Sequence, residues 1–154
     1  MKYCLDTSAI IDAAIRWYPP DVFPSFWDRL GDLATANELI SHEQVLLELE
    51  KKEGDVAHQW ALDHRQIFLS PTDETEAMML TVMGRFPEIA KGAKGQHFAD
   101  PFVIATASVH SSIVVTGERE TGNLSKPRIP DVCRELSISC LNIVDLIRAE
   151  GWQF

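Results

Sequence analysis

Short apolar segments alternate with amphipathic segments along the chain, and this alternation constrains the fold more than any other feature. The apolar segments predict strands at residues 2–6, 38–41, 66–69, 113–116 and 139–141. Periodicity and capping residues predict helices at 8–17, 24–35, 55–64, 72–83, 100–109, 129–136 and 143–150, with a further helix capped by Ser41. Strands that alternate with helices favour a mainly parallel sheet covered on both faces. The sequence therefore predicts an α/β fold with three layers, α/β/α.

Length and composition indicate one globular domain. The 154 residues suffice for a single domain over 1–154, and 45% hydrophobic with 24% charged residues is typical of a soluble protein. No apolar run approaches the roughly 20 residues of a membrane span, and Asp6 interrupts the only early apolar stretch. Cys4, Cys133 and Cys140 form no C-x-x-C pair, which favours reduced thiols. We therefore expect a cytoplasmic protein without a membrane partner.

The net charge of −9 argues against a protein that coats nucleic acid, since such proteins carry basic surfaces. It leaves open an enzyme that grips a nucleic acid locally. A cluster of carboxylates at a metal site would itself add to the acidic count.

Four acidic residues occur at or near predicted element boundaries: Asp6, Glu48, Asp100 and Glu118. The carboxyl edge of an open α/β sheet is where ligands and catalytic groups gather. Four carboxylates at one edge would repel one another unless a cation neutralised them. Carboxylates and water suit Mg²⁺ or Mn²⁺, and such ions activate water for phosphate-ester cleavage.

Each acid also has a structural interpretation. Asp6 fits the N-cap of the first helix, and Asp100 before Pro101 fits a common helix start. Glu48 fits the solvent face of an amphipathic helix, and Glu118 fits an ordinary loop acid after Gly117. Catalysis by these residues is therefore argued from the set and its order.

Four segments resemble the motifs of PIN domains, in the same order along nearly the whole chain. They read YCLDTSAIID at 3–12, SHEQVLLEL at 41–49, ADPFVIATA at 99–107 and VVTGE at 114–118. The chain is similar to a PIN-like group of bacterial and archaeal proteins, which resembles the ribonuclease toxins of toxin–antitoxin pairs.

This resemblance implies a metal-dependent endoribonuclease that acts on RNA, and its likeness to toxin–antitoxin ribonucleases suggests an antitoxin protein as partner. A homodimer is a candidate assembly on the general ground that dimers are the commonest oligomers. Carried over, all four acids named above become catalytic metal ligands or support them, and Ser8 and Thr116 lie near them. The chain departs from the family pattern in its fourth motif, where aspartate is frequent. Either Glu118 or Glu120 could reach the metal.

Two basic segments flank the predicted site. Lys91, Lys94 and His97 precede Asp100. The cations that follow Glu118 are Arg119, Lys126 and Arg128. If both acids line the site, these cations form a local rim for RNA. The alternative is that they are scattered surface charges that keep the chain soluble.

Two other functions compete with a nuclease. A phosphatase of the haloacid dehalogenase type would need a second aspartate where Ser8 stands, and serine cannot act as its general acid. A catalytically silent PIN-fold protein that binds protein or RNA would need no intact acids, yet all four motifs retain one.

Overall fold

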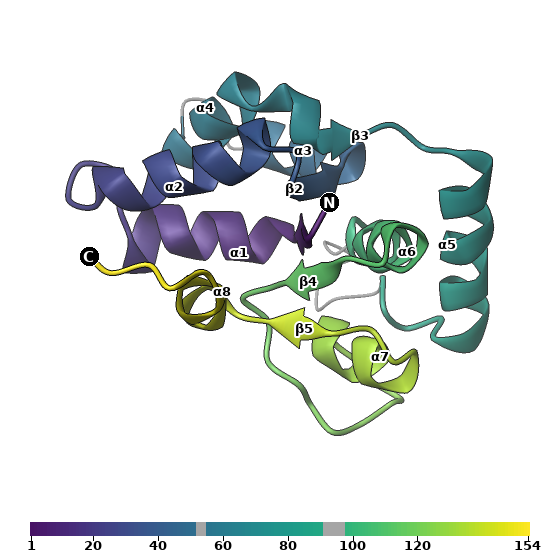
Figure 1. The fold of residues 1–154 in the computed structure, drawn as a ribbon. Coiled ribbons are helices and arrows are strands. Elements are labelled where there is room, and N and C mark those ends of the chain that lie inside the picture. Colours follow the sequence, from purple (N-terminus) through teal and green to yellow (C-terminus); the bar gives the residue numbers. More distant parts are fainter. Residues whose placement is uncertain (52–54, 91–97) are drawn as a thin grey trace.

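The computed structural model describes residues 1–51, 55–90 and 98–154, in which five strands form one parallel sheet (Figure 1). The strand order is β3-β2-β1-β4-β5. The strands are β1 (Tyr3–Leu5), β2 (Leu39–His42), β3 (Phe68–Leu69), β4 (Ile113–Val115) and β5 (Cys140–Leu141). Each neighbouring pair is parallel, so the predicted α/β fold with a mainly parallel sheet is confirmed.

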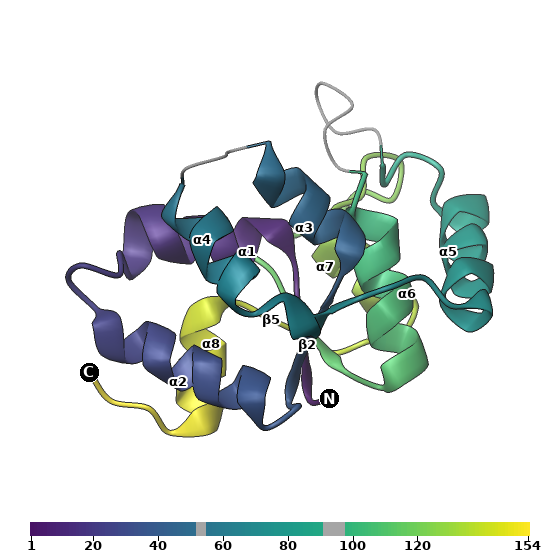
Figure 2. The same ribbon diagram turned by 90° about the horizontal axis from the view of Figure 1, so that it is seen from above.

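Helices cover both faces of this sheet. Figure 1 shows α5, α6 and α7 on one face and α1, α2 and α8 on the other, and Figure 2 shows the same layers from above. The helices are α1 (Thr7–Asp12), α2 (Pro24–Thr35), α3 (Glu43–Glu50), α4 (Val56–Asp63), α5 (Asp73–Arg85), α6 (Asp100–His110), α7 (Ile129–Glu135) and α8 (Ile143–Glu150). None of the helices in the described part of the chain is long and apolar enough to cross a membrane.

The central position of β1 follows from its composition. Tyr3, Cys4 and Leu5 are all fully buried, because a strand with helices on both faces has no solvent side. Tyr3 pairs with Leu39 of β2 and with Ile113 of β4. The residue that follows β1, Asp6, therefore stands in the middle of the carboxyl edge of the sheet.

Local structure departs from the sequence prediction in two places. The helix predicted at 8–17 is divided into α1 and a π-helical segment, η1 (Ala13–Trp17). Ser41 does not cap α3, because it belongs to β2 and its hydroxyl donates to the Leu5 carbonyl at 2.7 Å. His42 caps α3 instead, with Nδ1 accepting from the backbone N–H of Gln44 at 3.1 Å.

The apolar sequence around Phe23, Phe26 and Trp27 suggests a surface for a partner protein. Two of these three residues are buried, so the suggestion is wrong for them. Phe26 is fully buried and Trp27 is only 6% exposed. Trp152, near the end of the chain, meets Phe26 edge-on with ring centroids 6.3 Å apart. These aromatics fasten α2 and the C-terminal segment to the core.

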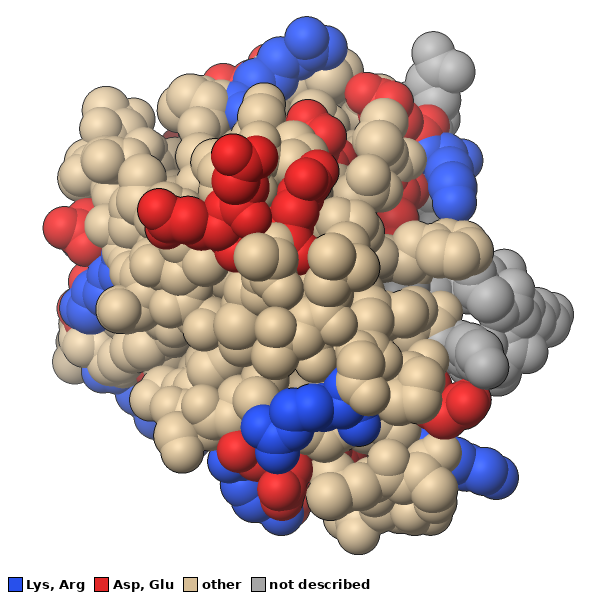
Figure 3. Space-filling view, turned by 90° about the vertical axis from the view of Figure 1, so that its right-hand side faces the viewer, with Lys and Arg blue, Asp and Glu red and all other residues tan. Residues whose placement is uncertain are grey.

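Charge is unevenly distributed over the face that includes α5. Figure 3 shows acidic side chains gathered in the upper part of this face, above a broad uncharged area. The first turn of α5 contains three acids, Asp73, Glu74 and Glu76. Negative charge at this end stabilises a helix, because it interacts favourably with the helix dipole.

Candidate metal centre

Three of the four predicted acids meet at the carboxyl edge of the sheet. Asp6, Asp100 and Glu118 each offer a carboxylate oxygen, and these oxygens lie within 4.8 Å of one another. Asp6 follows β1 and Glu118 closely follows β4. Because β1 and β4 are parallel neighbours, the residues after them reach the same edge. Helix α6, which Asp100 begins, packs against β1, β2 and β4 and so brings the third acid there.

Asp6 is held by hydroxyl and amide donors. Its Oδ1 accepts from the backbone N–H of Thr7 at 2.7 Å, which caps α1. Its Oδ2 accepts from the Ser8 hydroxyl at 2.5 Å and from the Thr116 hydroxyl at 2.8 Å. Ser8 Oγ in turn accepts from the Gly117 N–H at 2.9 Å. The carboxylate therefore both caps a helix and faces the cluster, and the two predicted supporting residues contact it directly.

Helix α6 begins at Asp100 with Pro101 in its first turn, as the sequence predicts, but Asp100 lies one residue inside the N-cap position. The N-cap of α6 is Ala99, which makes no side-chain capping bond, and Asp100 is the first helical residue. Its side chain is almost entirely buried at 4% exposure. Capping therefore does not account for this carboxylate, and its burial beside Asp6 and Glu118 requires another explanation.

Glu48 lies beside the cluster and is not one of the three grouped acids. Its Oε1 accepts from the backbone N–H of Ala99 at 2.9 Å. Ala99 has no side-chain oxygen that could accept a hydrogen bond at the start of α6. Glu48, which belongs to α3, provides a carboxylate acceptor there. Its negative charge also acts on Asp100.

Glu118, and not Glu120, belongs to the cluster. Its side chain is 8% exposed, with Oε2 accepting from the Ile129 N–H at 3.0 Å and Oε1 lying 3.5 Å from Arg128 Nη1. Glu120 forms an ion pair with Arg134 of α7. Of the two glutamates of the fourth motif, Glu118 is therefore the one that lies with Asp6 and Asp100.

Burial and mutual repulsion raise the pKa of two of these acids. Burial, followed by the charge of Glu118, raises the pKa of Asp6 to about 6, although the hydrogen bonds from Ser8 and Thr116 oppose this. Burial, followed by the charges of Asp6, Glu118 and Glu48, raises the pKa of Asp100. A cation at this point would offset both effects, since an opposite charge favours the ionised form.

The loop after Glu118 is organised by Asp131, which the sequence analysis missed. Its buried carboxylate accepts from the backbone N–H groups of Thr121, Gly122 and Arg128 at 2.8–3.0 Å. An acid at the third position of a helix, with Pro130 before it, is a signal that could have identified it. Asp131 fixes the loop that includes Arg119 and Lys126.

The structure describes only one of the two basic segments that the sequence predicts as a rim for RNA. Arg119 and Lys126 are exposed on the loop after Glu118. Lys91, Lys94 and His97 lie outside the described residues. Arg128, the third predicted cation of this loop, contacts the cluster, with Nη1 3.5 Å from Glu118 Oε1.

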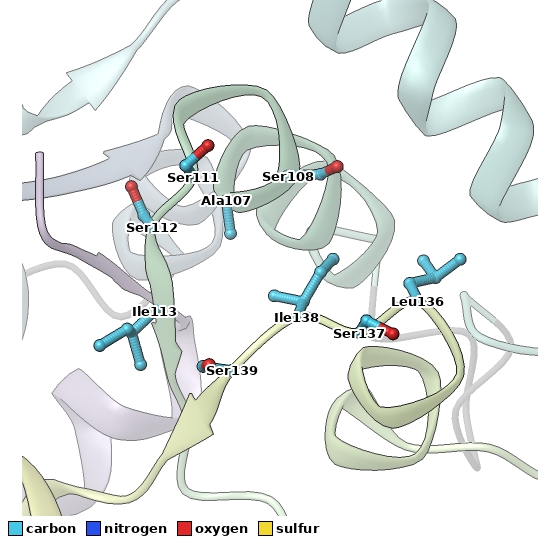
Figure 4. Close-up of a pocket in the computed structure, with 9 residues that line it drawn as sticks. All are labelled: Ala107, Ser108, Ser111, Ser112, Ile113, Leu136, Ser137, Ile138 and Ser139. Atoms are coloured by element: carbon cyan, nitrogen blue, oxygen red, sulfur yellow. The ribbon is translucent and has the colours of Figure 1, made fainter.

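Two cavities lie at opposite edges of the sheet. One of about 290 Å³ lies at the amino ends of β4 and β5 and is lined by several serines, as Figure 4 shows. Another, of about 480 Å³, lies at the carboxyl edge, and Gly117 and Glu118 form part of its wall. The second cavity therefore adjoins the carboxylate cluster.

Comparison with known proteins assigns the chain to a family and a fold. Residues 3–154 match the family model described as a domain of unknown function, DUF4411. The chain belongs to this family. No curated protein matches this DUF4411 domain. The crystal structure of FitAcB from Neisseria gonorrhoeae is similar at 15% identity, with 91% of this chain and 96% of that chain covered and a TM-score of 0.50. This similarity concerns the fold, which is PIN-like as predicted.

Proposed function

We propose that this DUF4411 domain is a metal-dependent endoribonuclease that hydrolyses phosphodiester bonds of RNA. The convergence of Asp6, Asp100 and Glu118 within 4.8 Å is the observation that carries the proposal. Three carboxylates with open positions for water suit Mg²⁺ or Mn²⁺, which prefer oxygen ligands. The burial of Asp6 and Asp100 supports a catalytic use, because buried acids with raised pKa values cluster at functional sites.

The residues of the site would have two roles: some would bind the metal ion, and others would orient the metal ligands. Asp6, Asp100 and Glu118 would hold the ion, with Glu48 shaping the site through the start of α6. A bound Mg²⁺ or Mn²⁺ ion supplies an activated water and neutralises charge on the leaving oxygen. Ser8 and Thr116 orient the Asp6 carboxylate, and Arg128 lies close enough to the cluster to meet a phosphate oxygen.

The biological setting belongs to the same proposal. The resemblance of the four motifs to ribonuclease toxins supports an antitoxin as protein partner, and we propose such a pairing for this chain. The three free cysteines fit the reducing cytoplasm, where RNA is available. A homodimer is the commonest oligomer and is the assembly we propose.

Calorimetric titration with Mn²⁺ tests the metal centre without knowledge of the substrate. Wild type should bind Mn²⁺, and Asp6→Asn and Asp100→Asn should each bind it much more weakly. Asp28→Asn, an exposed acid on α2, is the matched control and should bind as wild type does. Mn²⁺-dependent cleavage of total RNA that both active-site variants lose would establish the nuclease. Wild type without Mn²⁺ binding or cleavage would overturn the proposal in favour of a silent PIN-fold binding protein.

A further inference from the structure

A cavity of about 480 Å³ opens beside the carboxylate cluster, and the proposed nuclease does not account for it. It lies between η1, the loop after β4 and the start of α8 (elements in Figure 1). Its lining combines an exposed aromatic ring, two arginines and an amide: Trp17, Arg16, Arg119 and Asn142. Glu118 belongs to both the cavity and the candidate metal centre, so a bound molecule could occupy the two together.

Trp17 presents a large aromatic surface to this cavity. It is 62% exposed, and among the described residues no other aromatic ring stacks on its indole. The next residue, Tyr18, is anchored, because its ring stacks on Phe26 at 4.7 Å and its carbonyl accepts from Trp27 Nε1 at 2.6 Å. The backbone next to Trp17 is therefore held in place by the contacts of Tyr18, while the Trp17 indole is exposed to solvent.

Two arginines line the same cavity as the indole. Arg16 precedes it in η1, with Nη1 3.9 Å from Asp12 Oδ1 and a side chain that is 71% exposed. Arg119 directly follows Glu118, and no carboxylate of the described residues forms an ion pair with it. Two carboxylates, Asp12 and Glu118, also line the cavity, and Arg16 pairs with Asp12. Arg119 is therefore the lining arginine that is left for a phosphate of a ligand.

Asn142 adds a hydrogen-bond donor at the rim. Its Oδ1 accepts from the Asp145 N–H at 2.9 Å and thereby caps α8. This fixes the orientation of the amide and directs Nδ2 away from the helix. An amide NH₂ is a suitable partner for a carbonyl or ring nitrogen at the edge of a base.

We propose that this cavity binds one unpaired nucleobase of a single-stranded RNA, while an adjacent phosphate lies at the Asp6–Asp100–Glu118 cluster. The base stacks on Trp17, and Arg119 meets a neighbouring backbone phosphate. Aromatic stacking with flanking cations is how proteins bind single-stranded nucleic acid. This inference rests on the proposed nuclease and adds a base site, with Trp17 as its stacking surface, beside the candidate metal centre.

Fluorescence anisotropy with a short labelled RNA of mixed sequence, in EDTA and at low salt, separates base binding from cleavage. Trp17→Ala should weaken binding of the single strand about ten-fold or more, and Trp17→Phe should retain most of the affinity. Arg119→Gln should weaken binding and reduce its salt dependence by about one counterion. Leu80→Ala, an exposed apolar residue on α5, is the matched control and should bind as wild type does.

A duplex of the same sequence provides a second control, because paired bases cannot enter the cavity. Trp17→Ala should leave duplex binding and Mn²⁺ binding unchanged. If Trp17→Ala binds the single strand as tightly as wild type does, the base site is overturned, even where Mn²⁺-dependent cleavage is found. Wild type that binds Mn²⁺ but no RNA also overturns it. Absence of both Mn²⁺ binding and cleavage, with Trp17-dependent RNA binding intact, removes the nuclease and leaves a single-strand binding site.

Discussion

Thr116 and Asp6 lie 110 residues apart in the chain, yet the Thr116 hydroxyl donates a 2.8 Å hydrogen bond to Asp6 Oδ2. The parallel pairing of β1 with β4 creates this contact, since both residues directly follow paired strands. The same hydroxyl lies 3.2 Å from Ser8 Oγ and accepts from the Glu118 N–H at 3.1 Å. One threonine thus links two of the three clustered acids.

Thr116→Val should weaken Mn²⁺ binding at neutral pH. Loss of the hydroxyl removes a bond that lowers the Asp6 pKa, so that a proton competes more strongly with the metal. The same change should destabilise the protein by about 1–3 kcal/mol, the cost of an unsatisfied buried group. Calorimetry and thermal unfolding measure the two effects. Thr116→Ser keeps the hydroxyl and should behave as wild type does; equal losses in both variants would contradict this role.

Asp6 should lower the stability of the metal-free protein as pH rises from about 4 to 8, while His42, whose pKa burial lowers to about 4, acts in the opposite direction. The pKa of Asp6 is about 6 in the folded state against an ordinary value of 3.8. The unfolded chain therefore releases this proton first, and folding is disfavoured as pH passes through the folded pKa. For Asp6 the loss is about 3 kcal/mol once the carboxylate is fully ionised, and the raised pKa of Asp100 adds to it. Urea unfolding of wild type and Asp6→Asn in EDTA at several pH values measures this contribution as the difference between the two slopes, and equal slopes would contradict it.

Asp100→Asn should stabilise the metal-free protein at pH 8 and have little effect at pH 4. The substitution removes a buried charge beside Asp6, Glu118 and Glu48, and it leaves the N-cap residue of α6, Ala99, unchanged. The slope of stability against pH should become shallower. A large loss of stability at both pH values would show that the carboxylate has a structural role.

Glu48 offers a way to separate the metal site from helix capping. Glu48→Gln keeps an oxygen acceptor for the Ala99 N–H, so stability should remain close to that of wild type. Glu48→Ala removes the acceptor and should cost about 1 kcal/mol, as the loss of a helix cap does. If Glu48 also contributes charge to the metal, both variants should weaken Mn²⁺ binding. Unchanged affinity in Glu48→Gln would limit the residue to the start of α6.

Sequence patterns predict the elements well where the signals are local. Helix α2 begins at Pro24 and ends at Thr35 as predicted, because proline favours the first turn of a helix. The apolar runs also place the five strands in order along the chain.

Contacts between distant residues are what the sequence could not provide. The bond from Ala99 to Glu48 joins residues 51 positions apart, and its existence depends on how α3 packs relative to α6. The same holds for the acids: their order along the chain suggests a cluster, but only the packing of α6 separates Glu48 from the other three. The open indole of Trp17 likewise depends on the π-helical end of the first helix.

Gly117 should tolerate no side chain without displacement of its neighbours. A Cβ at this position would lie 2.5 Å from Asp12 Oδ2, 3.2 Å from the Ser8 carbonyl and 3.3 Å from Ser8 Oγ. The Asp12 carboxylate ends a flexible side chain and can move, whereas Ser8 is held by Asp6 and by the Gly117 N–H. Gly117→Ala should therefore cost about 1–3 kcal/mol of stability, as overpacking does.

The same substitution should also weaken Mn²⁺ binding, because displacement of Ser8 removes a hydrogen bond from Asp6. The double variant Gly117→Ala/Asp12→Ala isolates the cause, with Asp12→Ala alone as its reference. Removal of the Asp12 carboxylate relieves the shortest contact but leaves the Ser8 contacts in place. Mn²⁺ affinity should thus remain low in the double variant. Full recovery of affinity there would show that Asp12, and not Ser8, transmits the effect to the metal centre.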